Sequence, residues 1–515
     1  MTRNARVIDR AVILAAVAGL HLAVVHYYPA IYGGDTIIRL LNHSRILISY
    51  QLPLLQLLIH FTMRSFFRPD AIWVLMSAIS GIGAVGLYQL TWSITQDRRA
   101  ACLAAMFYAM HPFILFYSLV PYQEPLLLAT LVWGFCFLFL PASFFSLVCS
   151  GTLFGMACLN RYEGWIGAGV AVSFWIWRQK KQGGKLEWRG ILEAAAFFGW
   201  APVTWLAYNR GLSPAGTFVL DLEFHWARLY RPYFIAKSVL WWTESALALM
   251  ALFGFVALWA ASPSRRNRAM HSTILVFLLL FHAAMIFSGH GIEPDPLRFV
   301  TEREAYVPIA FLLLYAACGA GLLASEVERR LVGLPILGRA VPVLALVFLA
   351  LLCLNRGITR VAAANSDPEV KTAYEVAQFL RTKEPGAVIL AKPLPQEQIE
   401  YYLRQAEKAG GPQGREKAKL LLRKMEMTPF DYQRLVVFSW LPRKNLLPGD
   451  LFRDLDRPGI ERFLHSRGVG YLVAFSDFTP IEEHEKILLS LYSEEKTPEV
   501  EFHNGNKAAR IYRVF

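Results

Sequence analysis

Long apolar stretches recur along the first 360 residues, and short polar connections separate them. Eleven of these stretches approach the roughly 20 mostly apolar residues that a membrane-spanning helix needs. The predicted spans lie near residues 11–29, 71–94, 101–118, 126–141, 143–160, 164–178, 191–209, 238–261, 272–288, 305–323 and 341–355. This pattern predicts a mainly α-helical membrane protein with about eleven transmembrane helices.

The connection after the first span has a different pattern. Apolar residues recur at helical spacing over Thr36–Leu47 and again over Leu54–Phe67, but Arg39, Arg45 and Arg64 interrupt them. Charged residues at this frequency disfavour a spanning helix and favour helices that lie in the membrane interface. We therefore predict interfacial helices in this first outer loop.

Short alternating elements replace the long apolar runs beyond residue 360. Short buried strands are predicted within Ala387–Leu390, Leu435–Phe438, Gly468–Phe475 and Arg510–Phe515. Helical spacing is found over residues 370–381, 396–424, 460–466 and 481–492. This alternation predicts a soluble α/β domain over residues 361–515, following a polytopic transmembrane domain over residues 1–360.

The distribution of charge supports this division. The 515 residues are 55% hydrophobic and 18% charged, which is typical of a polytopic membrane protein. Residues 1–360 hold 29 Lys and Arg against 17 Asp and Glu, whereas the tail is nearly balanced with 23 against 22. The basic residues of the first part lie in short connections, so they indicate membrane orientation rather than nucleic-acid binding.

The same basic connections predict the topology, because they remain on the cytoplasmic side of a membrane. The N-terminus is then cytoplasmic, and an odd number of spans places the C-terminal domain outside the cytoplasm. The acidic connections fall on that outer side as well. We expect a multi-pass integral membrane protein, and we favour the bacterial inner membrane over the endoplasmic reticulum.

Asp35 is the first candidate for chemistry, in the first outer loop. It follows Gly33 and Gly34, which let the backbone turn sharply. A carboxylate on a tight turn beside interfacial helices is suited to act as a catalytic base near a lipid-borne substrate. The alternative is a turn residue that caps the helix beginning at Thr36.

Two further outer-side clusters contain ionisable residues at the ends of predicted spans. Tyr122 and Glu124 precede the span near residue 126, where the alternative role of Glu124 is a first-turn acid that complements the helix dipole. Arg161 and Glu163 lie in a very short connection between two spans. Ionisable groups at membrane depth are functional candidates, and the alternative is a local ion pair.

A third cluster lies in the connection that leads into the span near residue 305. It contains His290, Arg298 and Arg303. Paired guanidinium groups beside a membrane surface match the geometry of a phosphate. The alternative is a solvated loop whose charges pair at helical spacing.

Taken in order, these segments resemble the polytopic membrane glycosyltransferases of the C-type (GT-C) fold that use polyprenyl-phosphate sugar donors, such as protein mannosyltransferases and aminoarabinose transferases. The matching segments are the acid after the first span, Gln51-Leu52-Pro53-Leu54, Asp97-Arg98-Arg99-Ala100-Ala101, Tyr122-Gln123-Glu124-Pro125-Leu126, Asn160-Arg161-Tyr162-Glu163-Gly164 and residues 302–308. Two features depart from the family pattern. Thr36 follows Asp35 where many relatives have a second acid, and Ala305 separates Glu304 from Tyr306 where Arg and Tyr are often adjacent.

The resemblance implies inverting transfer of a sugar, such as a mannose-type hexose, from a polyprenyl- or dolichyl-phosphate donor to an extracytoplasmic acceptor. Its implied catalytic base is Asp35, and its acceptor- and sugar-binding residues are Tyr122, Glu124 and Glu163. The donor-phosphate residues are His290, Arg161, Arg298 and Arg303. The acceptor is a lipid, a glycan or a protein. The sequence assigns no metal ligands and requires no cofactor, although the resemblance is compatible with a divalent metal.

Two other functions stay open at this stage. A ligase of preassembled lipid-linked glycans would use an oligosaccharide diphosphate in place of a monosaccharide monophosphate. A transporter or lipid flippase would show ionisable residues in the middle of its spans, broken helices and internal repeats. We find no internal repeat in this sequence, and its charges gather at the outer helix ends.

Overall fold

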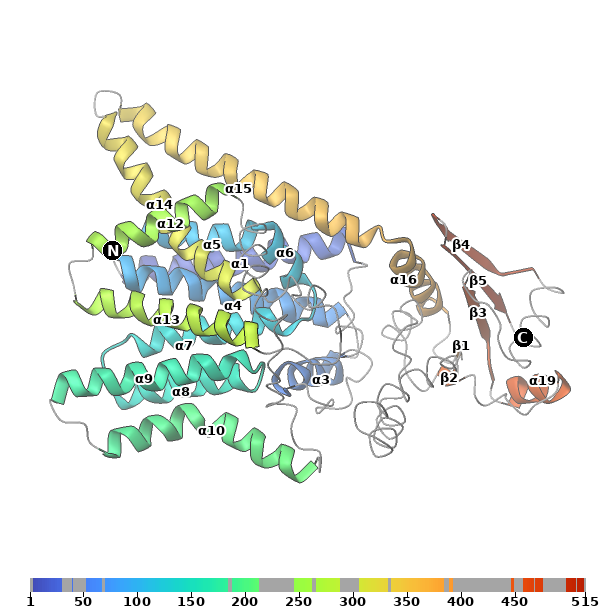
Figure 1. Cartoon of the computed structure of the whole chain (residues 1–515). Coiled ribbons are helices and arrows are strands. Elements are labelled where there is room, and N and C mark those ends of the chain that lie inside the picture. Colours follow the sequence, from blue (N-terminus) through green and yellow to red (C-terminus); the bar gives the residue numbers. More distant parts are fainter. Residues whose placement is uncertain are drawn as a thin grey trace. The chain divides into compact units, whose positions relative to one another are not determined.

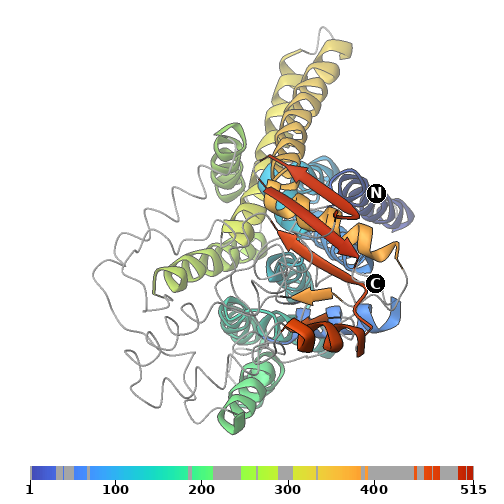
Figure 2. The ribbon, with the colours of Figure 1, turned by 90° about the vertical axis from the view of Figure 1, so that its right-hand side faces the viewer.

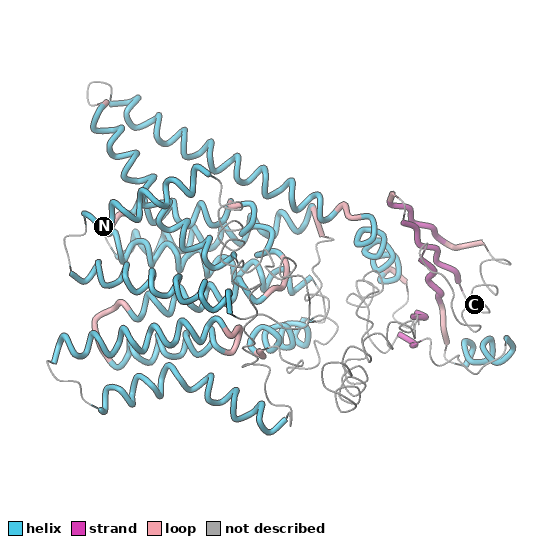
Figure 3. The backbone as a smooth tube through the Cα atoms, in the orientation of Figure 1, coloured by secondary structure: helices cyan, strands magenta, loops and turns pink. Residues whose placement is uncertain are grey.

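The structure is a computed structural model of the whole chain. It describes residues 3–29, 39, 52–66, 70–183, 188–212, 245–261, 265–287, 305–331, 335–383, 389–391, 446–448, 457–466, 468–475, 497–505 and 507–513. The chain forms two compact units. The first comprises Met1–Tyr27 and Asn42–Val361, and the second comprises Tyr28–Leu41 and Ala362–Phe515. Strands occur in the described part of the second unit, whereas the described part of the first is helical (Figure 3).

The first unit is a bundle of helices (Figure 1). They are α1 (Arg3–Tyr27), α3 (Leu54–Phe66), α4 (Asp70–Thr95), α5 (Arg98–Met110), α6 (Pro112–Leu119), α7 (Gln123–Leu138), α8 (Phe144–Cys158), α9 (Glu163–Gly183), α10 (Trp188–Leu212), α12 (Ser245–Ala261), α13 (Arg265–Phe287), α14 (Tyr306–Arg330) and α15 (Pro335–Asn365). Every predicted span overlaps one of these helices. Helix α3 lies where the second helix of the first outer loop is predicted, whereas the stretch predicted as the other lies outside the described residues except for Arg39.

The stretch predicted as one span over residues 101–118 is two helices. Helices α5 and α6 meet at an angle of 63°, with His111 between them and Pro112 opening α6. Proline cannot donate a backbone hydrogen bond, and it disfavours a helical conformation in the preceding residue. The bend therefore follows from a sequence feature inside the apolar run.

Five of the described helices are long and apolar enough to cross a membrane, namely α1, α4, α10, α14 and α15, and the bent pair would make a sixth. The shorter apolar helix α12 also exposes large apolar side chains, because Leu249, Leu252 and Val256 are exposed whereas Leu247 and Ala251 are buried. Large apolar side chains facing outward along a helix suit a lipid environment. The protein is an integral membrane protein, and the count of eleven spans stays a prediction.

Helices α12 and α14 pack unusually closely at Gly254 and Gly319. A Cβ atom added to Gly319 would lie 2.1 Å from the carbonyl oxygen of Met250, and one added to Gly254 would lie 2.1 Å from that of Tyr315. Only glycine allows backbones to approach to this distance, which is a common way for membrane helices to associate.

An ionic network around the buried carboxylate of Asp9 joins α1, α4 and α5 near the N-terminus. The Arg98 guanidinium donates hydrogen bonds of 2.9 and 2.6 Å to the two carboxylate oxygens of Asp9, and the Tyr88 hydroxyl donates one of 2.8 Å. Asp97 caps α5 by accepting a hydrogen bond from the backbone N–H of Arg99. This network explains the conspicuous basic turn of the sequence as a connection between three helices.

The helices of the first unit alternate in direction. The N-terminus, the α4–α5 connection, the end of α9 and the beginning of α13 therefore lie at one end of the bundle (Figure 1, left). Basic residues are concentrated at these helix ends. Helix α3 and the beginnings of α7 and α9 lie at the other end, which we call the site end.

The second unit contains a five-stranded sheet with the strand order β2-β1-β3-β5-β4 (Figure 2, orange and red arrows). Its elements are α16 (Pro368–Arg381), β1 (Ile389–Ala391), β2 (Leu446–Pro448), α19 (Arg457–Ser466), β3 (Tyr471–Phe475), β4 (Val500–Asn504) and β5 (Lys507–Arg513). Strand β1 pairs in parallel with β2 and β3, whereas β5 pairs antiparallel with β3 and β4. The Asn504 side chain donates to Glu375 at 2.8 Å and so fastens α16 to the sheet.

The predicted elements of the tail correspond partly to this unit. Strands β1, β3 and β5 and helices α16 and α19 overlap predicted ones, whereas β2 and β4 were not predicted. The predicted strand over 435–438 and the predicted helices over 396–424 and 481–492 lie outside the described residues. The solubility of this unit and its side of the membrane stay predictions.

Candidate active site

The connection between α8 and α9 is a tight turn, and it sets the position of two ionisable side chains. The backbone N–H groups of Asn160 and Arg161 both donate to the carbonyl oxygen of Ala157, at 3.1 and 3.0 Å. A Cβ atom on Gly164 would lie 2.4 Å from that same oxygen, so the chain can enter α9 here only with glycine. The turn brings Arg161 and Glu163 to the site end of the bundle.

The beginning of α7 supplies the second carboxylate. Glu124 lies in the first helical turn, followed by Pro125, whose missing N–H costs nothing at this position. The Glu124 side chain is only 3% exposed. A carboxylate in the first turn is stabilised by the helix dipole, and burial adds a strong need for a cationic partner.

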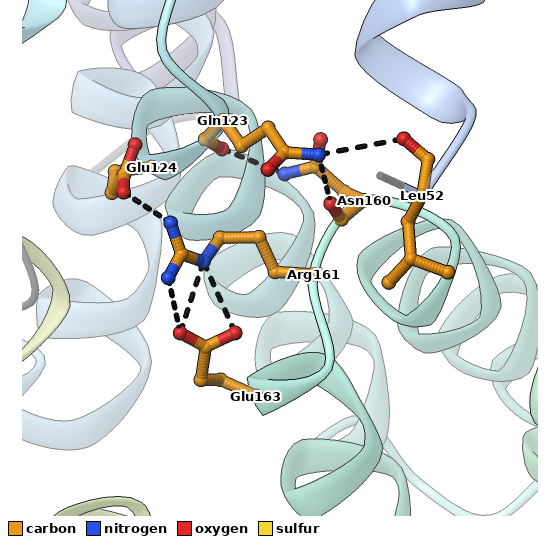
Figure 4. Close-up of polar contacts among 6 residues, drawn as sticks. All are labelled: Leu52, Gln123, Glu124, Asn160, Arg161 and Glu163. Carbon is orange, nitrogen blue, oxygen red and sulfur yellow. Dashed lines mark hydrogen bonds and ion pairs between the residues drawn. The ribbon is translucent and has the colours of Figure 1, made fainter. Parts of the chain in front are cut away.

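Arg161 is that partner, and it joins both carboxylates (Figure 4). Its Nη1 donates to Glu124, while its Nε lies 3.0 Å from each carboxylate oxygen of Glu163 and its Nη2 also donates to Glu163. The Glu163 side chain is 8% exposed and that of Arg161 is 16% exposed. We call Glu124, Arg161 and Glu163 the acidic cluster.

The acidic cluster carries two formal negative charges and one positive charge. Its carboxylate oxygens accept hydrogen bonds, so they are suited to hydroxyl and ammonium groups. Arg161 fixes the orientation of both carboxylates, because a guanidinium group presents its donors in a rigid plane. The arrangement is therefore suited to hold a polyhydroxylated group such as a sugar.

Aromatic and hydroxyl side chains surround the beginning of α7. The ring of Tyr122 lies 5.5 Å from that of Tyr117. A buried chain of hydroxyls continues from α6, because the Tyr306 hydroxyl is 2.7 Å from that of Ser118 and 2.8 Å from that of Tyr108. These bonds fix the first residue of α14, which follows directly on the predicted phosphate-binding connection.

The structure brings together all the predicted site residues that it describes. Tyr122 directly precedes α7 and Glu124 lies in its first turn, and Arg161, which is paired with Glu163, reaches Glu124 across 37 positions of sequence. Asp35, His290, Arg298 and Arg303 lie outside the described residues. Among the residues that are described, no group of three or more His, Cys, Asp or Glu side chains could hold a metal ion.

Sequence reasoning assigned no role to Gln123 and Asn160, although both lie in the segments that it singled out. Gln123 Nε2 donates to the carbonyl oxygen of Asn160, and Asn160 Nδ2 donates to that of Gln123. Their amide side chains gave no signal of their own, because such residues are also common in surface turns.

The helix bundle and its buried acidic cluster are typical of a polytopic membrane protein with a polar site at one end. Comparison with solved structures shows which fold the bundle has. No family model matches the sequence, and no curated protein matches it. The structure is similar to that of ArnT from Cupriavidus metallidurans bound to undecaprenyl phosphate, with a TM-score of 0.50, 11% sequence identity and 97% of both chains covered. The chain thus has the GT-C glycosyltransferase fold, in agreement with its sequence resemblance.

Two other glycosyltransferases also match, with lower scores. The archaeal oligosaccharyltransferase AglB from Archaeoglobus fulgidus has a TM-score of 0.46 and 14% identity, with 90% of this chain and 69% of that chain covered. Mycobacterial arabinofuranosyltransferase AftD has a TM-score of 0.40 and 15% identity, with 93% of this chain and 36% of that chain covered.

Proposed function

We propose that this protein transfers a sugar from a polyprenyl- or dolichyl-phosphate donor to an extracytoplasmic acceptor, with inversion at the anomeric carbon. The observation that carries the proposal is the buried acidic cluster at the site end of a GT-C bundle, opposite the basic helix ends. The ArnT structure with the same fold is described as bound to undecaprenyl phosphate, which supports a lipid phosphate as the donor.

The proposed reaction is a single in-line displacement. The acceptor oxygen or nitrogen forms a bond to the anomeric carbon while the bond from that carbon to the phosphate oxygen breaks, and its electron pair leaves with the phosphate. The proton of the acceptor moves to the Asp35 carboxylate, which acts as the general base. Phosphate leaves readily when cations stabilise its charge, so one base and a cationic phosphate site suffice.

The contacts within the acidic cluster divide the proposed roles. Glu124, Glu163 and Tyr122 bind hydroxyl groups of the acceptor or the sugar. Arg161 is also proposed beside the donor phosphate, and its described contacts with two carboxylates support an additional role in orienting them. Arg303 is proposed to bind the phosphate with it, and Arg298 and His290 are further candidates.

The proposal extends to the kind of sugar and the kind of donor. We favour a mannose-type hexose carried on a monophosphate, as the sequence resemblance implies. The competing ligase activity would require an oligosaccharide on a lipid diphosphate. Presenting the purified protein with both donor types, each radiolabelled in the sugar, distinguishes the two activities by which label reaches the acceptor fraction.

The proposed base is tested by Asp35→Asn. Asparagine keeps the shape of aspartate and caps helices equally well, so a purely structural Asp35 predicts near-normal stability and activity. A catalytic Asp35 predicts normal stability with transfer reduced by roughly 10²-fold or more. Asp35→Glu should also largely fail, because its longer arm displaces the carboxylate by about 1 Å.

Asp70→Asn is the matched control, because it makes the same chemical change in the first turn of α4 at the site end. Sugar transfer from a synthetic polyprenyl-phosphate donor should be unaffected by this change. Robust transfer by Asp35→Asn would place the base elsewhere, and Glu124 would be the next candidate.

A further inference from the structure

The acidic cluster is built on a second set of contacts, which involve side-chain amides (Figure 4). Each member of this set is adjacent in sequence to a member of the cluster: Gln123 precedes Glu124, and Asn160 precedes Arg161. Gln123 Nε2 donates to the Asn160 carbonyl oxygen at 2.5 Å, and Asn160 Nδ2 donates to the Gln123 carbonyl oxygen at 2.6 Å. The two residues thus exchange hydrogen bonds reciprocally.

The same amide group reaches a third element. Gln123 Nε2 is 3.4 Å from the carbonyl oxygen of Leu52, and the N–H of Leu54 donates to the carbonyl oxygen of Leu159 at 3.0 Å. Leu52 lies just before α3, within the first outer loop. Because an amide nitrogen carries two hydrogens, Gln123 can serve both carbonyl oxygens at once.

Asn160 is fully buried, so these bonds matter for its position. Its Nδ2 bond to the Gln123 carbonyl oxygen fixes the direction of the amide, and its Oδ1 atom has no hydrogen-bond partner among the described residues. A buried polar side chain held by so few bonds depends strongly on each of them. Loss of the Gln123 contacts would therefore loosen the position of Asn160 and, with it, that of the neighbouring Arg161.

We propose that Gln123 and Asn160 are positioning residues, which fix Glu124 against Arg161 and tie both to the segment of the first outer loop that precedes α3. This amide clamp, formed by Gln123, Asn160 and the Leu52 carbonyl group, acts through the acidic cluster. Its importance for catalysis rests on the proposed function, because the cluster is the proposed binding site for acceptor or sugar.

Gln123→Met tests the clamp, because methionine has nearly the same length but donates no hydrogen bond. Gln96→Met is the matched control, since Gln96 is exposed beyond the opposite end of α4. We expect Gln123→Met to lower kcat by about 10-fold or more with little change in the donor KM, because misplacement of an orienting group affects the reacting geometry. Gln96→Met should have normal kinetics.

A double variant separates positioning from a merely structural effect. A residue that acts only through Glu124 has no further effect once that carboxylate is gone. Gln123→Met should therefore cost nothing more in a Glu124→Gln background. A full additional loss of transfer in that background would overturn the proposal.

Hydrogen–deuterium exchange of the purified full-length protein gives a readout that does not need activity. Peptides covering residues 52–57 and 158–165 should exchange about five-fold faster or more in Gln123→Met than in the wild type. In Gln96→Met their exchange rates should equal those of the wild type. Absence of transfer by the wild type would refute the proposed function, whereas unchanged exchange in Gln123→Met would refute the clamp. If Gln123→Met does not fold, Gln123→Ala replaces it, because it also lacks the donor and brings no charge beside the two carbonyl oxygens.

Discussion

At the scale of single residues, the acidic cluster depends on Arg161, the cation that both carboxylates share. Arg161→Met keeps part of the apolar stem of the side chain but removes its guanidinium group. Glu124 and Glu163 then stay buried without this cation. We expect a loss of about 3–5 kcal/mol in the free energy of unfolding. Arg161→Lys should recover only part of this, because an ammonium group cannot reproduce the planar contact with two carboxylates. Thermal unfolding in detergent measures both changes.

Arg329→Met provides the comparison for this prediction. Arg329 also pairs with a glutamate, Glu326, but its side chain is 76% exposed. Solvent screens an exposed pair, so this variant should unfold nearly like the wild type. Equal destabilisation by the two Arg→Met changes would show that burial of the cluster does not matter for stability.

Arg303 is predicted to contact the donor phosphate. Loss of its charge-assisted hydrogen bonds in Arg303→Ala should cost on the order of 2–4 kcal/mol of transition-state stabilisation. The dependence of transfer on donor concentration measures this loss, with Arg268→Ala at the basic end of the bundle as the control. Unchanged donor dependence in a folded Arg303→Ala protein would remove Arg303 from the site.

Part of the site could be predicted from sequence because ionisable residues are conspicuous beside apolar runs. Glu124 and Arg161 were both singled out in this way. Their contact could not be predicted, because it depends on how the beginning of α7 aligns with the α8–α9 turn 37 positions later. The local ion pair of Arg161 and Glu163 was the alternative interpretation, and the structure adds Glu124 to it.

At the scale of elements, prediction succeeded where the pattern was long. Apolar runs of helical length all correspond to helices, whereas β2 has three residues, too few for a period of two to be visible. Its partner β1 is equally short, and their parallel pairing is set by the fold and not by local sequence. The bend at Pro112 was not predicted, because the span over residues 101–118 was assigned from its apolar composition without weighing the proline within it.

The close contact between α12 and α14 predicts which glycine substitutions lower the stability of the protein. Gly319→Ala would place a methyl group 2.1 Å from the Met250 carbonyl oxygen, so the helices must separate. Overpacking of this kind costs about 1–3 kcal/mol. Gly169→Ala is the control, because a Cβ atom there meets nothing within 4 Å and alanine favours helix. The melting temperature should fall for the first variant and stay level or rise for the second.

At the scale of the whole molecule, the orientation in the membrane is the main prediction to test. The second unit should lie on the side opposite the basic helix ends. Ser466→Cys places a thiol at an exposed position of α19, and Gln96→Cys places one at an exposed position beside the basic turn. A membrane-impermeant thiol reagent should label the first variant in intact cells and the second only after permeabilisation.

The wild-type protein is the control for this labelling, because none of its six cysteines is exposed. Labelling of Gln96→Cys in intact cells, with Ser466→Cys protected, would reverse the predicted topology. It would also place the proposed site on the cytoplasmic side and exclude an extracytoplasmic acceptor.

The pairing of Asp9 with Arg98 has a consequence for how this protein is made. The two residues are 89 positions apart, yet the Asp9 side chain is only 8% exposed. At a synthesis rate of about 5–20 residues per second, the ribosome reaches Arg98 roughly 5–20 seconds after Asp9. During that interval the Asp9 carboxylate lacks the guanidinium partner that it has in the folded protein. The contact that joins α1 to the α4–α5 turn can therefore form only after α1, α4 and the first residue of α5 have all been synthesised.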